Sequence, residues 1–67
     1  MRESAWVIEG IGPIYWNGKG LYPSCFTGDH LQAIRFSRKV DAEVVLYYLL
    51  EIHAIFLAAR EHVWMGE

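Results

Sequence analysis

The spacing of hydrophobic and polar positions changes along this chain. Short runs of aromatic and β-branched residues occupy the first part, and a long apolar run extends from Val44 to Ala59. The run Ala5–Glu9 has the composition of a strand, and two glycines and a proline break regular structure at Gly10–Pro13. We therefore predict a strand followed by a turn.

A second strand and a chain reversal are predicted next. Ile14–Trp16 is a short aromatic and β-branched run, and Asn17-Gly18 after it supplies residues that a type I′ turn prefers. The following residues include another glycine and a proline, so they predict a loop with a residue or two of strand around Leu21 and Tyr22.

The middle of the chain predicts a single helical turn and then another strand. Thr27 or Asp29 can cap the turn, because short oxygen-bearing side chains accept hydrogen bonds from the first free amides. Ala33–Ser37 alternates, with Ile34 and Phe36 on one side, as a strand with one solvated face does. We expect this strand to be central or nearly central in the sheet.

A helix is predicted to begin near Arg38–Val40. Ser37 stands at the expected N-cap, and Asp41 and Glu43 fall in the first turns, where the helix dipole favours negative charge. No glycine or proline marks its end, which the sequence leaves open between residues 53 and 59.

Apolar residues on this helix repeat at intervals of three and four, which predicts a stripe that packs on the sheet. The stripe comprises Ala42, Val45, Leu46, Leu49, Ile52 or His53, and Phe56. The other side is also apolar, with Val44, Tyr47, Tyr48, Leu50, Ile55 and Leu57. Because a helix that is apolar nearly all round is normally buried on more than one side, we expect a homodimer or a complex with another protein.

The end of the chain alternates again over Arg60–Met65, which predicts a closing strand, with a continued helix as the alternative. The predicted fold class is α+β: one compact domain of residues 1–67, with a small antiparallel sheet of three to four strands packed on one long helix, in the order ββ(turn)βαβ. The expected core comprises Trp6, Ile8, Ile34, Phe36, Val45, Leu49, Ile52 and Phe56.

Composition narrows the class of protein. Hydrophobic residues make up 54% of 67 residues, more than a core this small can bury, which again favours self-association or a partner. The formal charge of -2 is too small to steer a polyanion. A lone cysteine, no visible signal segment, and an apolar run interrupted by Glu51 and His53 predict a cytoplasmic protein with no membrane helix.

The residues that could carry catalysis or bind metal are few. Cys25, Asp29 and His30 combine a nucleophile, a carboxylate and a base close in sequence, but their spacing is not diagnostic, and a lone cysteine is commonly buried and inert. We expect no enzyme activity.

Metal binding would draw on histidines and acids, namely His30, His53, His62, Glu51 and Glu61. None of these follows a ligand spacing such as His-x3-His, so we expect no metal and no cofactor.

Binding residues are easier to nominate. Arg35, Arg38 and Lys39 gather positive charge near the predicted helix N-terminus, where free amides also attract anions, although acidic residues follow at once. Adjacent Tyr15 and Trp16 point to opposite faces of a strand, so at least one of them leaves the core. The candidate partner-binding residues are Tyr15, Trp16, Tyr22, Arg35, Arg38, Lys39, Tyr47 and Tyr48.

The order of several short motifs resembles small proteins encoded by bacteriophages and prophages. They are Tyr15-Trp16-Asn17-Gly18, Phe26-Thr27 with Asp29, Ala33-Ile34-Arg35-Phe36, Asp41-Ala42-Glu43 and Glu61-His62-Val63-Trp64. The resemblance implies a short α+β unit and carries no catalytic residue. Such proteins, anti-CRISPR proteins among them, often bind and block a host complex.

That resemblance implies a non-enzymatic inhibitor of a host bacterial complex, such as a CRISPR–Cas effector. One alternative is a nucleic-acid-associated protein that uses sheet aromatics and the small basic rim. A second is a phage structural, assembly or self-associating protein.

Overall fold

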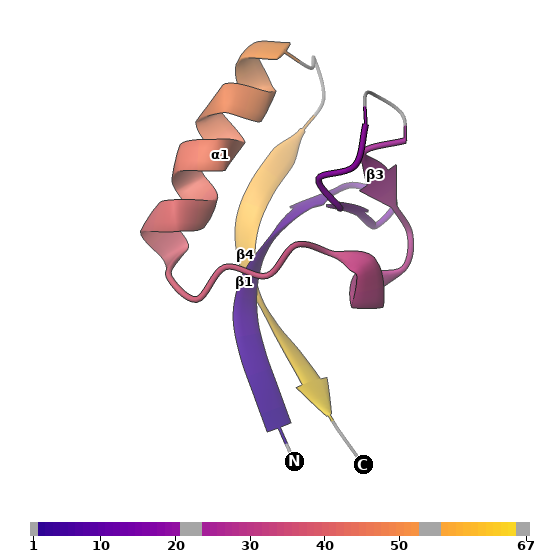
Figure 1. Ribbon diagram of the computed structural model, residues 1–67, viewed down its shortest axis with the longest axis vertical. Helices are drawn as coiled ribbons and strands as arrows, with labels where there is room; N and C mark the ends of the chain where they lie inside the picture. The colour runs from indigo at the N-terminus through magenta and orange to yellow at the C-terminus, as the bar shows by residue number, and fades with distance from the viewer. Residues whose placement is uncertain (1, 21–23, 53–55, 66–67) are drawn as a thin grey trace.

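The computed structural model describes residues 2–20, 24–52 and 56–65. It is a small α+β fold in which a four-stranded antiparallel sheet, in the order β3-β2-β1-β4, packs against one helix (Figure 1). The elements are β1 Arg2–Gly10, β2 Ile14–Trp16, β3 Phe26–Thr27, the 3₁₀ turn η1 His30–Gln32, α1 Lys39–Ile52 and β4 Leu57–Met65. The predicted fold class is therefore confirmed.

The two longest strands, β1 and β4, make up most of the sheet. They pair antiparallel over nine positions, from Arg2 opposite Met65 to Gly10 opposite Leu57. Figure 1 shows this pair running the length of the molecule, with α1 beside its upper half. Both strands are longer than their sequence patterns predicted, because pairing between the two ends of the chain extends each beyond its alternating run. The alternative of a continued helix after residue 60 is wrong.

The predicted turn at Gly10–Pro13 connects β1 to β2. The type I′ turn at Asn17-Gly18 is wrong, because Gly18 has a φ of 74° but Asn17 does not share a positive φ, and β3 begins only at Phe26. Asn17 instead closes the longer connection: its Nδ2 donates to the Ser24 carbonyl oxygen and its Oδ1 accepts from the Lys19 amide. Leu21 and Tyr22 lie outside the described residues.

The segment after β3 contains the predicted helical turn but not the predicted strand. Asp29 caps η1 through a hydrogen bond that its carboxylate accepts from the Leu31 amide. Ala33–Ser37 is not a central strand: it makes a single β-bridge, in which Phe36 and Trp6 exchange two backbone hydrogen bonds of 2.8 Å. This position on β1 is open because β2 pairs only with its last residues.

Helix α1 begins at Lys39, within the predicted range. The Ala42 amide bonds to the Arg38 carbonyl oxygen, so Arg38 and not Ser37 takes the N-cap position. The described helix ends at Ile52. Its end was predicted between residues 53 and 59, and the first three of these, residues 53–55, lie outside the described residues. Over the described parts of the chain, no helix is both long and apolar enough to span a membrane.

Both faces of the sheet are covered near its centre. On one face, Ile8 packs with Leu46 and Leu49 of α1. On the other, Val7 packs with Trp64 and with Ala33, which follows η1. Ile8 and Val7 are fully buried because successive side chains of β1 enter the two opposite clusters.

The expected core was only partly right. Ile8 and Leu49 are buried, and Trp6, Phe36 and Val45 are half-buried. Ile34, Ile52 and Phe56 are exposed, by 36%, 54% and 84%. Phe56 was expected in the core because the predicted helix pattern extended too far along the sequence, whereas the chain has left α1 before Phe56. Ile34 was expected there as part of a strand, but it lies outside a continuous strand. The buried hydrophobic residues that the expected core did not include are Val7, Tyr15, Cys25, Ala33 and Trp64. Ala42 and Leu46 are buried as well, as the helix stripe predicted.

Candidate functional site: the outer face of the helix

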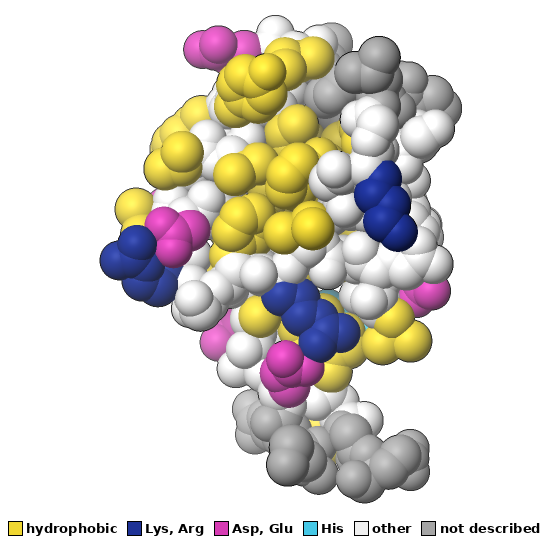
Figure 2. Space-filling model, in the orientation of Figure 1, with side chains coloured by type: hydrophobic (Ala, Val, Ile, Leu, Met, Phe, Trp, Pro, Cys, Tyr) yellow, Lys and Arg dark blue, Asp and Glu magenta, His cyan; other side chains and the backbone are white. Residues whose placement is uncertain are grey.

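The side of α1 that faces away from the sheet is largely apolar, although Glu51, three residues after Tyr48, is also exposed on this side. Its exposed apolar side chains are Val40, Val44, Tyr47 and Tyr48, here called the outer α1 face. They follow one another at intervals of four, three and one, and because an α-helix turns once in 3.6 residues they lie together, opposite the buried residues of the same helix. In Figure 2 apolar side chains spread broadly over the upper part of the molecule, around α1.

Exposure on this face is high for apolar residues. Tyr47 and Tyr48 are 67% and 64% exposed, and Val44 is 65% exposed. Leu50 and Ile52 extend the apolar surface toward the end of the helix. Clustered apolar exposure of this kind is typical of surfaces that bind another protein, because covering it removes apolar area from water.

The two cationic side chains near the start of α1, Arg38 and Lys39, already contact other side chains. Arg38 donates two hydrogen bonds of 3.0 Å to the carboxylate of Asp41, from Nε and from an NH2 group. The hydrogen bonding to Asp41 and the charge of that carboxylate raise the pKa of Arg38 above its ordinary value. The Lys39 ammonium lies 5.5 Å from the centroid of the Trp6 ring.

Arg35 does not belong to the same cluster. Its guanidinium forms an ion pair with Glu3 of β1 and lies over the ring of Trp64. The basic rim expected from the sequence is therefore divided between two places in the fold. In both places a carboxylate already neutralises an arginine.

The aromatic candidates have different surroundings. Tyr15 is only 7% exposed and packs in the core with Val7. Trp16 is half-buried and stacks on Phe36, with ring centroids 6.3 Å apart. Tyr22 lies outside the described residues. Of the nominated aromatic residues that are described, Tyr47 and Tyr48 are the two that offer an open surface.

The residues considered for catalysis do not assemble into a reactive group. Cys25 is buried, and the carboxylate of Asp29 accepts hydrogen bonds from Leu31 and Gln32. The His30 ring packs instead against His62, with centroids 5.0 Å apart. This arrangement has the contacts of a capped turn and an aromatic cluster.

The histidines do not form a metal site in the described part of the chain. No group of three or more His, Cys, Asp or Glu side chains there could hold a metal ion. His30 and His62 contact each other and Trp64, while His53 lies outside the described residues.

The sequence did indicate part of the outer α1 face. Tyr47 and Tyr48 were nominated, and Val44 was placed on the second apolar side of the helix, but Val40 was not. The intervals of four and three residues between Val40, Val44 and Tyr47 could have placed Val40 on the same face, because residues at these intervals are neighbours on a helix surface.

Comparisons with protein-family models, curated proteins and solved structures found no match to this chain. The residues and their arrangement are therefore the basis for assigning a function.

Proposed function

We propose that this protein acts by binding another protein through the outer α1 face, as a small non-enzymatic inhibitor of a host bacterial complex. The target class that the sequence resemblance suggests is a CRISPR–Cas effector, and the site of action would be the cytoplasm of the host cell. The observation that carries the proposal is the exposure of Val44, Tyr47 and Tyr48 on one side of a helix whose other side is buried.

Tyrosines suit this role for a physical reason. Each presents a large apolar ring with a polar hydroxyl and has few rotatable bonds, so little conformational entropy is lost on binding. Tyr47 and Tyr48 together expose on the order of 250 Å² of side chain, given about 200 Å² for a whole aromatic residue. With Val40, Val44 and Leu50 added, the surface is large enough to form the centre of a protein interface, which buries roughly 800 Å² on each partner.

Nucleic-acid binding is the weaker alternative. Such binding needs several cations free to replace counterions at phosphates. Arg35 and Arg38 are paired with Glu3 and Asp41, and the formal charge of the chain is -2. A partner with phosphates would first have to displace these carboxylates.

The experiment that tests the proposal is affinity capture with the tagged protein from a bacterial lysate that contains active CRISPR–Cas complexes. Retained proteins are identified by mass spectrometry, and target cleavage by the retained complex is assayed. We expect an effector subunit to be retained in near-stoichiometric amount, with loss of DNA binding or cleavage.

The variant Tyr47→Ser/Tyr48→Ser should lose this retention. Met65→Ser is the matched control, because Met65 is also an exposed apolar residue, at the far end of β4. If both variants retain the effector equally, the outer α1 face is not the binding surface. If the protein captures only itself and light scattering gives a stable homodimer, self-association replaces inhibition as the use of this face.

A further inference from the structure

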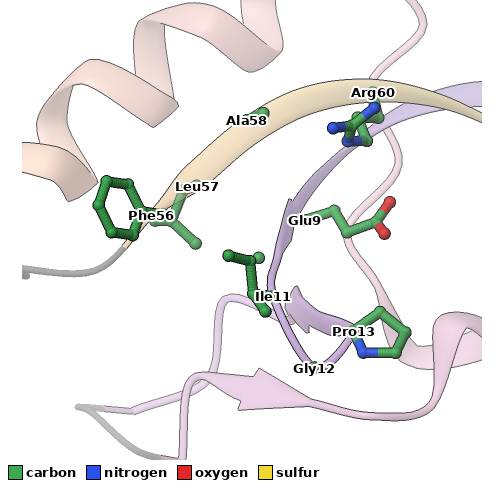
Figure 3. A pocket seen from close by; sticks show the side chains of 9 residues that line it. Glu9, Ile11, Gly12, Pro13, Phe56, Leu57, Ala58 and Arg60 are labelled. Atoms are coloured by element: carbon green, nitrogen blue, oxygen red, sulfur yellow. The ribbon is translucent and has the colours of Figure 1, made fainter.

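A groove lies between the Gly10–Pro13 turn and the start of β4, on a different part of the surface from the outer α1 face. Its volume is about 620 Å³, within the roughly 300–1,000 Å³ typical of small-ligand pockets. Its lining residues are Glu9, Gly10, Ile11, Gly12, Pro13, Phe56, Leu57, Ala58 and Arg60 (Figure 3).

One part of the lining is apolar and open to water. Ile11 is 83% exposed and Phe56 is 84% exposed, although both are large hydrophobic residues. Figure 3 shows Ile11 and Leu57 turned toward each other, with Phe56 beyond them. An apolar side chain of a ligand placed here would cover these residues and remove apolar area from water.

The other part of the lining carries one charge of each sign. Glu9 lies opposite Ala58 and Arg60 lies opposite Val7, so Glu9 and Arg60 project from the same face of adjacent strands at diagonal positions. Figure 3 shows both side chains at the same end of the groove. They form no ion pair with each other or with another described residue, unlike Arg35 and Arg38.

We propose that this groove binds a zwitterionic amino acid with an apolar side chain. The α-carboxylate would accept hydrogen bonds from the Arg60 guanidinium, whose planar donors match a carboxylate. The α-ammonium would donate to the Glu9 carboxylate, and the side chain would lie on Ile11 and Phe56. A ligand with both charges on one carbon satisfies both unpaired groups at once, which a neutral apolar molecule does not. This site is independent of the proposed function of the outer α1 face.

The proposal is tested by titrating the ¹⁵N-labelled protein with L-phenylalanine and following amide chemical shifts by NMR. We expect saturable shifts at Gly10, Ile11 and Leu57, with a dissociation constant in the millimolar range, as ligand efficiency gives for roughly a dozen heavy atoms. Two comparison ligands separate the contributions: N-acetyl-L-phenylalaninamide has the ring without the charges, and glycine has the charges without the ring. Each should bind about tenfold more weakly, or worse.

Two variants test the assigned partners separately. Arg60→Gln and Glu9→Gln should each weaken phenylalanine binding about tenfold or more, since each removes one charged hydrogen bond. Arg38→Gln is the matched control and should leave binding unchanged. The proposal is overturned if the capped amide binds as tightly as phenylalanine, if both groove variants bind normally, or if the wild-type shifts do not saturate or lie outside the groove.

Discussion

The guanidinium carbon of Arg35 lies 4.1 Å from the centroid of the Trp64 ring, and the same guanidinium bonds to Glu3. Arg35 thus joins the segment after η1 to both long strands, since Glu3 belongs to β1 and Trp64 to β4. Trp64 is 7% exposed and also packs against His62 and His30. The contact between Arg35 and Trp64 helps to cover the face of the sheet that α1 does not cover.

Replacing Arg35 should therefore loosen that face. We expect Arg35→Ala to lower the free energy of unfolding by about 1–2 kcal/mol, from the lost cation–π contact and a partly exposed ion pair. Arg35→Lys should recover part of the loss, because an ammonium keeps the charge but not the planar stack. Urea unfolding measures both, and an Arg35→Ala effect no larger than that of Arg38→Ala would contradict the contact's role.

Gly10 leaves no room for a side chain. A Cβ at this position would lie 3.0 Å from the Phe56 carbonyl oxygen and 3.1 Å from a Leu57 methyl carbon. We expect Gly10→Ala to destabilise the protein by about 1–3 kcal/mol, because the nearest atom is backbone and cannot easily move. Gly28→Ala is the control: a Cβ there would have no atom within 4 Å, so thermal unfolding should change little or shift upward. Equal effects at the two glycines would refute the crowding at Gly10.

Asn17 should be hard to replace. Its buried side chain bonds to the backbone on both sides of the β2–β3 connection, at Lys19 and Ser24. Asn17→Ala should cost about 1–3 kcal/mol, since it removes both hydrogen bonds of a buried side chain. Chemical denaturation provides the measurement, with Gln32→Ala as a control because the Gln32 side chain makes only an exposed hydrogen bond. A loss no greater than the control's would show that Asn17 does not hold this connection.

Neighbouring residues of α1 should differ sharply in their effect on stability. Leu46 is 8% exposed and packs on Ile8, so Leu46→Ala should cost about 2–5 kcal/mol and unfold much of a domain this small. Tyr47 is 67% exposed, so Tyr47→Ser should stay within about 0.5 kcal/mol of the wild type. Circular dichroism during urea unfolding distinguishes them. A large loss for Tyr47→Ser in the dilute protein would indicate that the outer α1 face is already covered, as in a homodimer.

The local parts of the fold were predictable because their causes are local. Aromatic and β-branched runs predicted β1 and β2, and the glycines and proline predicted the turn between them. Thr27 and Asp29 were the two predicted caps of the helical turn, and Asp29 caps η1. The start of α1 followed from its acidic first turn and its three- and four-residue spacing. Tyr47 and Tyr48 lie outside the stripe that this spacing predicted to pack on the sheet. They could therefore be nominated as binding residues before the fold was known.

Pairing between distant segments decided the rest. Alternation predicted β4 only from residue 60, whereas β1 supplies partners back to Leu57; alternation also predicted a strand at Ala33–Ser37, where β1 supplies one bridge. The burial of Val7 and Tyr15 depends on the segment around Ala33 crossing the second face of the sheet, and no local pattern records that path. The sequence by itself determined which segments could be strand, turn or helix, because those preferences act between near neighbours. Only the tertiary structure decided which apolar side chains are buried, which arginines are neutralised, and that Glu9 and Arg60 share one groove, because these depend on contacts between residues far apart in the chain.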